Sequence, residues 1–290
     1  MNRRQLVWLV GLALTNLLFS LWMGQQAYKW MPPQASAEAV LVDHLFSFMT
    51  VIGSFIFVGV TGTLLYSIIF QRAAKYDASD GPPIEGNVTL EIIWTAIPIL
   101  LVIWIATVSY QTYHDMSILG PITNAGLTEK VAATEHPPIE VRSRQWAWEF
   151  YYPEANVSST ELHLPIDQRA RFKLTSEDVL HGFYVPAFRV KQDIVPGKEI
   201  DFSFTPIRLG RYRLRDSEYS GTYFAANQTD VVVETPEAYQ QWLNTTAALS
   251  PTTASNTAYD EYQKVIKSSG FRWDTVPPAP APTVNYSARN

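Results

Sequence analysis

The chain has 290 residues, of which 47% are hydrophobic and 17% are charged, and its formal net charge is −5. This mild acidity gives no signal for nucleic-acid binding. The absence of cysteine excludes disulfides, thiol chemistry and lipid attachment through a cysteine. Apolar segments dominate before about residue 113 and an ordinary globular composition follows, so the sequence predicts a membrane anchor joined to an external domain.

The first apolar segment covers residues 6–23 and follows the basic pair Arg3 and Arg4. Its 18 residues are just enough to span a bilayer as a helix. A basic start before an apolar core is also typical of a cleaved signal peptide, for which residues 35–37 offer a distant cleavage site. Both interpretations are open at this point, and in both the residues that follow are exported.

The second and third apolar segments predict a transmembrane helical hairpin. Residues 45–70 carry no charge and would be about 39 Å long as a helix, against a hydrocarbon core of about 30 Å. Residues 90–110 form the third segment, which Pro98 interrupts. Arg72 and Lys75 place the intervening loop on the cytoplasmic side by the positive-inside rule, and the rest of the chain then lies outside.

The external part predicts short strands separated by turns, because apolar and polar residues alternate along it. The expected strands cover residues 139–143, 144–152, 161–165, 171–175, 199–205, 211–215 and 230–234, with a turn at 191–197. Thr235 as N-cap and Pro236 after it predict a helix over residues 235–243. A second short helix is expected at 258–267, followed by a Pro- and Ala-rich tail.

Residues 87–98 read Asn-Val-Thr-Leu-Glu-Ile-Ile-Trp-Thr-Ala-Ile-Pro and resemble the second-helix signature of haem–copper oxidase subunit II. In that family the glutamate, Glu91 here, lies at the mouth of a proton pathway into subunit I. An ionisable residue at the edge of a span is a functional candidate. The alternative interpretation of Glu91 is an interfacial carboxylate that fixes the depth of the helix.

Two further segments resemble the same family in the same order. Residues 144–152 resemble its aromatic strand, in which Trp146 would be the point where electrons from cytochrome c enter. Trp146 and Trp148 also share one face of a strand, which ordinary core packing would explain. Residues 178–188 resemble the family's histidine segment, and we interpret His181 as a retained structural residue because one imidazole is a poor copper site.

The loop from Arg215 resembles the family's CuA loop, C-S-E-x-C-G-x-x-H-x-x-M, with Glu218 kept and the copper ligands replaced. The two cysteine positions, the histidine position and the methionine position hold Asp216, Ser220, Phe224 and Asn227. A copper pair that shares electrons needs soft thiolate bridges. The sequence therefore predicts that this chain binds no copper, with His181 as the one ligand position that survives.

The resemblance implies a membrane-anchored all-β protein, with a transmembrane hairpin and one extra N-terminal span before a cupredoxin-like Greek-key β-sandwich. The expected segments are an N-terminal span or signal (1–37), the hairpin (38–112), a linker (113–137), the external domain (138–235), and a C-terminal helix with its tail (236–290). Residues 80–87 also resemble the cyanobacterial branch of the family.

The resemblance also implies subunit II of a proton-translocating terminal oxidase that reduces oxygen to water with electrons from a membrane quinol. No cofactor is expected in this chain, since haem and CuB belong to subunit I, although Glu218 could hold Mg²⁺ at the boundary with that subunit. Subunits I and III, quinol bound through subunit I, and membrane lipid are the expected partners. The location would be a bacterial plasma or thylakoid membrane, with the C-terminal domain on the periplasmic or lumenal side.

Two other functions remain open from the sequence. One is a cytochrome c oxidase subunit II with a degenerate donor site, and the other is a non-catalytic assembly or binding module. Co-purification with a haem-containing subunit separates the last from the two oxidases, and turnover with quinol or with reduced cytochrome c separates the oxidases from each other.

Overall fold

The computed structural model describes residues 2–72, 76, 86–116 and 137–269. It divides into a helical unit, Met1–Met31 with Val42–Tyr113, and a β-rich unit, Pro32–Leu41 with His114–Asn290. Lys75 of the expected cytoplasmic loop, most of the expected linker and the Pro- and Ala-rich tail lie outside the described residues.

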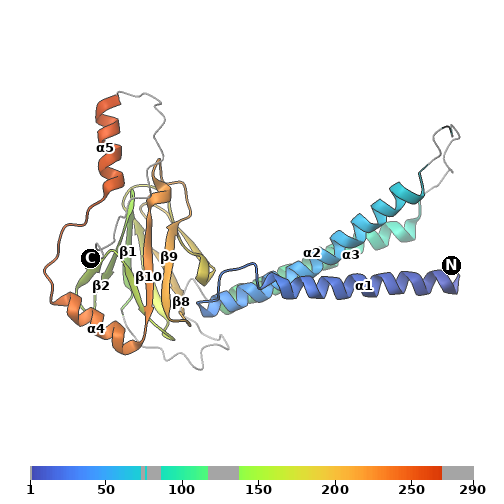
Figure 1. Ribbon diagram of the computed structural model, residues 1–290, viewed down its shortest axis with the longest axis horizontal. Coiled ribbons are helices and arrows are strands. Elements are labelled where there is room, and N and C mark those ends of the chain that lie inside the picture. The colour runs from blue at the N-terminus through green and yellow to red at the C-terminus, as the bar shows by residue number, and fades with distance from the viewer. Residues whose placement is uncertain (1, 73–75, 77–85, 117–136, 270–290) are drawn as a thin grey trace. The chain divides into compact units, whose positions relative to one another are not determined.

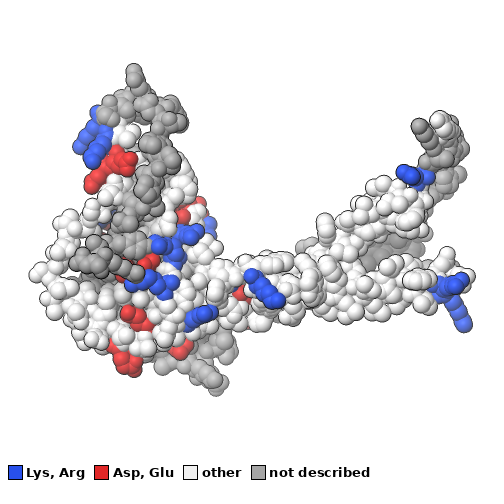
Figure 2. Space-filling model, in the orientation of Figure 1, with Lys and Arg blue, Asp and Glu red and all other residues white. Residues whose placement is uncertain are grey.

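Three helices, α1 (Arg3–Ala27), α2 (Ala37–Phe70) and α3 (Val88–Met116), are long and apolar enough to cross a membrane. All three extend beyond their apolar cores. Helix α2 begins eight residues before the predicted span, where the hydroxyl of Ser36 accepts a hydrogen bond from the Ala39 N–H at 3.0 Å and caps the helix. On the face shown in Figure 2, most of the helical surface is uncharged, whereas charged side chains are scattered over the β-rich unit.

Small and polar residues join α1 to α2 within the helical unit. The hydroxyl of Ser47 donates to the Gly24 carbonyl at 2.9 Å, and a Cβ on Gly24 would lie 2.4 Å from a methyl group of Val51. The amide of Asn16 donates to the Phe55 carbonyl at 3.0 Å. Small residues allow transmembrane helices to approach closely, so the expected extra N-terminal span packs directly on the hairpin.

Two five-stranded sheets make up the β-sandwich (Figure 1). The first has the order β3-β2-β1-β5-β8 and the second β4-β10-β9-β6-β7. The strands are β1 (Ile139–Arg144), β2 (Ala147–Tyr152), β3 (Val157–Ser159), β4 (Leu162–Pro165), β5 (Ala170–Ser176), β6 (His181–Val185), β7 (Val190–Ile194), β8 (Ile200–Phe204), β9 (Gly210–Asp216) and β10 (Gln228–Glu234). Strand β1 is parallel to β5 and β10 is parallel to β4, while the other pairs are antiparallel.

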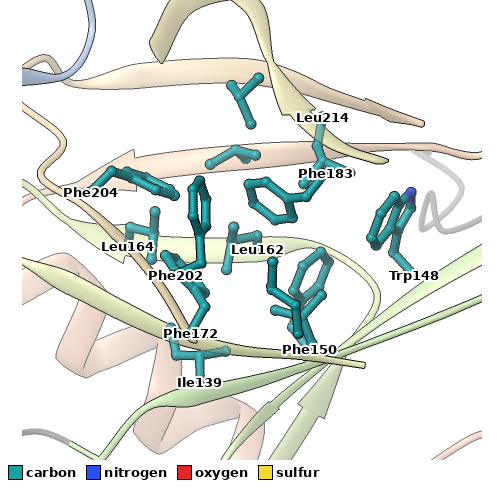
Figure 3. Close-up of a cluster of buried hydrophobic side chains, with 14 of the residues drawn as sticks. Ile139, Trp148, Phe150, Leu162, Leu164, Phe172, Phe183, Phe202, Phe204 and Leu214 are labelled. Atoms are coloured by element: carbon teal, nitrogen blue, oxygen red, sulfur yellow. The ribbon is translucent and has the colours of Figure 1, made fainter. Parts of the chain in front are cut away.

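Aromatic side chains from both sheets fill the space between them (Figure 3). Trp148 and Phe150 of β2 are buried because alternate residues of a strand point to the same face. The ring of Phe183 lies 6.0 Å from Trp148 and 5.6 Å from Phe202, measured between centroids, and the rings of both pairs are steeply tilted. Such edge-on pairs are favourable beyond the area they bury.

The turn expected at residues 191–197 is shorter in the structure. Val190–Ile194 forms strand β7, which pairs with β6, and the turn itself follows with a Lys198 N–H to Val195 carbonyl bond at 3.1 Å. Gly197 in this turn has a φ of +74°, a conformation that favours glycine. The strand was missed because polar Gln192 occupies the face that Val190 and Ile194 bury, which interrupts the alternation.

Helices α4 (Pro236–Ala247) and α5 (Thr257–Ser269) follow the last strand. As predicted, Thr235 caps α4 by accepting from the Ala238 N–H at 3.3 Å. Trp242 of α4 stacks on the imidazole of His163 with a centroid distance of 3.9 Å, and Leu243 is buried against the core. The stack fixes α4 against the edge strand β4.

Pro32–Leu41 belongs to the β-rich unit, although the sequence placed these residues at the end of the first span and the start of the hairpin. Three backbone hydrogen bonds attach the segment: Ala35 N–H to the Ala187 carbonyl (3.1 Å), Ala37 N–H to the Thr205 carbonyl (2.9 Å) and Ile207 N–H to the Ala35 carbonyl (2.9 Å). The first residues of α2 therefore form part of the edge of the sandwich.

A buried ion pair reinforces this attachment. The carboxylate of Glu38 is 2% exposed and accepts from Arg169 at 2.7 Å and from the Thr205 N–H at 3.1 Å. Arg169 also donates to the hydroxyl of Ser203 at 2.9 Å and to the Met116 carbonyl at 3.1 Å. The guanidinium thus joins the residues before the second span to those after the third, and its many partners offset the cost of burying charge.

Replacement of Arg169 by methionine should destabilise the chain by about 3–5 kcal/mol, because it leaves the Glu38 carboxylate buried without a cation beside it. Thermal and denaturant unfolding of the purified chain in detergent, followed by tryptophan fluorescence, measures the effect. Lys173→Met is the matched control, since Lys173 pairs with Glu199 on the exposed surface and should change stability little. Equal losses of stability from the two substitutions would contradict the conclusion that Arg169 holds the start of α2 on the sandwich.

Candidate functional site

The candidate site lies at one end of the sandwich, where β6 and β9 pair. Phe183 is opposite Asp216 in this register, and His181 begins β6 on the same side. The side chains of His181 and Asp216 are both fully buried, and their Nδ1 and Oδ2 atoms are 2.7 Å apart. Residues separated by 35 positions in the chain therefore meet as a close buried ion pair.

The carboxylate of Asp216 is the centre of the hydrogen-bond network. Besides the His181 ring, its oxygens accept from four groups: the Gly182 N–H (2.8 Å), the Glu218 N–H (3.1 Å), the Ser220 hydroxyl (2.8 Å) and the Asn227 amide (3.0 Å). Burial raises the pKa of Asp216, but these hydrogen bonds outweigh burial and hold the pKa below its usual value.

The second ring nitrogen of His181 meets another carboxylate. Its Nε2 lies 2.9 Å from Oδ1 of Asp178, which sequence analysis had not singled out although it begins the histidine segment. Both ring nitrogens thus lie within hydrogen-bond distance of a carboxylate oxygen, an arrangement that favours the doubly protonated imidazole. Burial lowers the pKa of His181, but the hydrogen bonds to Asp216 and Asp178 outweigh burial and raise the pKa above its usual value.

Phe224 does not join this network. It begins the short helix η2 (Phe224–Ala226), and its ring packs on Tyr219 with a centroid distance of 5.4 Å. Of the five positions equivalent to copper ligands, the structure thus brings four together, His181, Asp216, Ser220 and Asn227, and places the fifth in an adjoining aromatic cluster.

The two tryptophans of the aromatic segment are both buried. Trp148 donates to the Asn227 carbonyl at 3.2 Å and packs between the site and the core. Trp146 precedes β2, is fully buried, and donates to the Ser220 carbonyl at 3.0 Å. Trp148 is therefore a core residue, whereas Trp146 is hydrogen-bonded to the loop that contains Ser220. The role of Trp146 in electron transfer stays a prediction.

A close approach of the loop to Gln145 and Trp146 requires a glycine. Gly221 has a φ of +110°, and a Cβ on it would lie 2.8 Å from the Gln145 amide and 3.1 Å from the Trp146 ring. The Gln145 amide also donates to the Ser220 carbonyl at 2.7 Å. The glycine of the family's loop is thus explained by both its backbone conformation and the space available.

Glu218 lies beside the network with its carboxylate facing Lys191. The ammonium group of Lys191 is 2.7 Å from Oε1 of Glu218 and 3.4 Å from Asp193. A Mg²⁺ ion bound by Glu218 would therefore have to displace or share this cation, and the Mg²⁺ site stays a prediction.

Glu91 belongs to the helical unit. It lies in the first turn of α3, is exposed, and follows Asn87, whose side chain accepts from the Leu90 N–H at 3.1 Å. A carboxylate near a helix N-terminus is favourable by itself. The structure thus places Glu91 at the end of the span where the sequence expected it, and its role in a proton pathway stays a prediction.

The donors at this site do not fit a thiolate-bridged copper pair. The chain has no cysteine, and the oxygen atoms of Asp216 already accept hydrogen bonds from five surrounding groups. In the part of the chain that the structure describes, no group of three or more His, Asp or Glu side chains is arranged to hold a metal ion.

Comparison with known proteins assigns the family. The family described as "Cytochrome C oxidase subunit II, transmembrane domain" matches residues 20–112, and "Cytochrome C oxidase subunit II, periplasmic domain" matches residues 156–235. A Synechocystis sp. protein named "Cytochrome c oxidase subunit 2" is 34% identical over 81% of this chain and 80% of its own length. The chain belongs to the cytochrome c oxidase subunit II family.

Relatives within the family carry different names. The "Quinol oxidase subunit 2" of Bacillus subtilis (strain 168) is 29% identical over 87% of this chain and 76% of its own length. Among solved structures, the periplasmic domain of subunit II of cytochrome oxidase from Bradyrhizobium japonicum is 25% identical, with a TM-score of 0.36 over 38% of this chain and 91% of that domain.

Family membership confirms the predicted subunit II of a haem–copper oxidase, a multi-subunit oxidoreductase. The transmembrane match covers the end of α1, all of α2 and most of α3, and the periplasmic match covers β3 to β10 of the sandwich. The chain is therefore a membrane protein with a periplasmic C-terminal β-domain, as the sequence predicted. Relatives named for cytochrome c and for quinol both occur in the family, so membership alone does not specify the electron donor.

The buried ion pair makes stability depend on pH in a predictable direction. His181 has a raised pKa, so its contribution is complete below 6.5 and is lost as the pH rises through the raised value. Asp216 has a lowered pKa, so its contribution is complete above 3.8 and is lost as the pH falls through the lowered value. Unfolding should therefore require most denaturant between these two pH values.

His181→Gln is the control for this pH dependence, because glutamine keeps a hydrogen-bonding side chain without the charge. Denaturant unfolding of the full-length chain at a series of pH values is the measurement. The difference in unfolding free energy between the two chains should shrink as the pH rises above 6.5. A difference that stays constant up to alkaline pH would show that His181 is neutral in the folded chain.

Proposed function

We propose that this chain is subunit II of a proton-translocating terminal oxidase that takes electrons from a membrane quinol and not through CuA. The observation that carries this proposal is the His181–Asp216 ion pair. At a position where the family's CuA loop has a cysteine, this chain has a carboxylate that is hydrogen-bonded to the one remaining ligand histidine. Electron exchange between two coppers needs thiolate bridges, which neither an oxygen donor nor a phenyl ring can replace.

The proposal assigns the chemistry of oxygen reduction to haem and CuB in subunit I and a supporting role to this chain. The α1–α2–α3 anchor would pack against subunit I, with subunit III as a further partner. Glu91 would supply a protonatable group at the start of α3, since an ionisable residue at the edge of a span is a candidate for a proton pathway. Glu218 would hold Mg²⁺ at the boundary with subunit I in exchange for its bond to Lys191.

A second candidate function is a cytochrome c oxidase subunit II with a degenerate donor site. The 34% identity to the Synechocystis sp. protein named "Cytochrome c oxidase subunit 2" favours it, since this exceeds the 29% identity to the Bacillus subtilis "Quinol oxidase subunit 2". Overall identity is dominated by residues that set the fold, whereas the donor depends on a few site residues. The ligand positions therefore weigh more, and quinol is the donor that we propose.

Turnover of the purified oxidase tests the choice of donor. Oxygen consumption should be sustained by a short-chain quinol and should stay at background with reduced cytochrome c. Trp146→Phe in the assembled enzyme should leave quinol oxidation unchanged, because no electrons pass through the loop that Trp146 contacts. Rapid oxidation of cytochrome c, abolished by Trp146→Phe, would instead support the second candidate.

A further inference from the structure

A second cluster, separate from the polar site, lies where helix α5 meets the end of the sandwich. Trp146 and Ala226 of the sandwich are buried against Ala258 of α5. The indole of Trp146 is 5.2 Å from the ring of Tyr223 and 5.1 Å from the ring of Tyr262, measured between centroids. Both rings meet the indole edge-on or nearly so, an arrangement that favours aromatic pairs.

Helix α5 makes this contact with one side of its first two turns. Ala258 is buried, and Tyr262 lies four residues later on the same face of the helix. Tyr259, on a different face, is 41% exposed, and Ile266 near the end of the helix is also exposed. The contact is therefore small and is carried mainly by one aromatic side chain of α5.

Asn256 fixes the start of the helix to the sandwich. Its Oδ1 caps α5 by accepting from the Tyr259 N–H at 3.1 Å, and its Nδ2 donates to the Gln145 carbonyl at 3.2 Å. Burial raises the pKa of the Tyr223 phenol, and the neighbouring carboxylate of Glu261 on α5 raises it further. Asn256 thus both caps the start of α5 and attaches it to the sandwich beside Trp146.

The helix has little stability of its own. It has 13 residues, and isolated helices shorter than about 12–15 residues are marginal in water. Residues 248–256, which connect it to α4, contain no helix or strand. We therefore expect helix formation and docking to be coupled, and no strand pairing of either sheet depends on α5.

We propose that α5 is a detachable cap that occupies the aromatic surface of Trp146, Tyr223, Phe224 and Ala226 and excludes other proteins from this end of the sandwich. Trp146, which the family resemblance marks as the point where electrons from cytochrome c enter, is closed off by the chain itself. The proposal concerns access to this surface, and its test measures that access without reference to the electron donor.

Thiol labelling of the purified full-length chain in detergent tests the cap. Since the chain has no cysteine, Ala226→Cys introduces a single thiol on the covered surface, and a maleimide reports its accessibility. Adding Tyr262→Ala should speed labelling at least about tenfold, the factor that corresponds to about 1.4 kcal/mol of lost docking energy. A chain shortened after Leu249 should label at least as fast.

Two matched variants make the result specific. Tyr262→Phe keeps the ring against Trp146 and should leave labelling slow, as should Tyr259→Ala, which removes an exposed tyrosine from the same helix. Equal acceleration by Tyr259→Ala and Tyr262→Ala would overturn the proposal. Fast maleimide labelling of Ala226→Cys and, in a separate chain, of Ala258→Cys, each without a second substitution, would also overturn the proposal. The assay needs no oxidase activity, so its failure is distinct from a failure of the quinol proposal.

Discussion

The ion pair between His181 and Asp216 is the interaction on which the end of the sandwich depends. Both side chains are fully buried, so each charge requires the other, and Asp178 completes the pairing on the second ring nitrogen. The loop residues Ser220 and Asn227 then turn inward because the Asp216 carboxylate can accept from them. In this chain, an ion pair and hydrogen bonds stabilise the loop that resembles the family's CuA loop.

The same loop connects the polar network to the outer surface of the domain. The Ser220 carbonyl accepts from both Gln145 and Trp146, and Trp146 in turn contacts Tyr262 of α5. The ligand position that has become Phe224 contributes its ring to this aromatic cluster. The replaced ligand positions and the aromatic surface beside α5 thus share one loop, and both support the proposal that electrons do not enter at this end of the domain.

Much of the fold could be predicted because it depends on local patterns. The apolar segments predicted the three helices, alternation predicted most strands, and resemblance to the family's CuA loop identified Asp216, Ser220 and Asn227, which the structure brings together. What could not be predicted depends on pairs that are distant in sequence. Glu38 and Arg169 are 131 residues apart, and no local pattern shows that the start of α2 belongs to the sandwich.

Asp178 and α5 show the same limit at the site itself. Asp178 lies three residues before His181, which suggests proximity, but only the start of β6 brings its carboxylate to the second ring nitrogen. The sequence predicted a short helix near residues 258–267, yet its amphipathic pattern does not say which surface it covers. The same limit applies to function. The motifs were enough to predict the family, whereas the electron donor depends on the chemistry of a few positions.

Copper loading of the purified full-length chain, expressed without other subunits, tests the central claim most directly. Metal analysis after removal of loosely bound ions, together with near-infrared absorption, measures both the amount of copper and its electronic state. The account predicts less than stoichiometric copper and no near-infrared band, because Asp216 and His181 bind each other and no thiolate is present. Tight, stoichiometric copper with a mixed-valence band would contradict it.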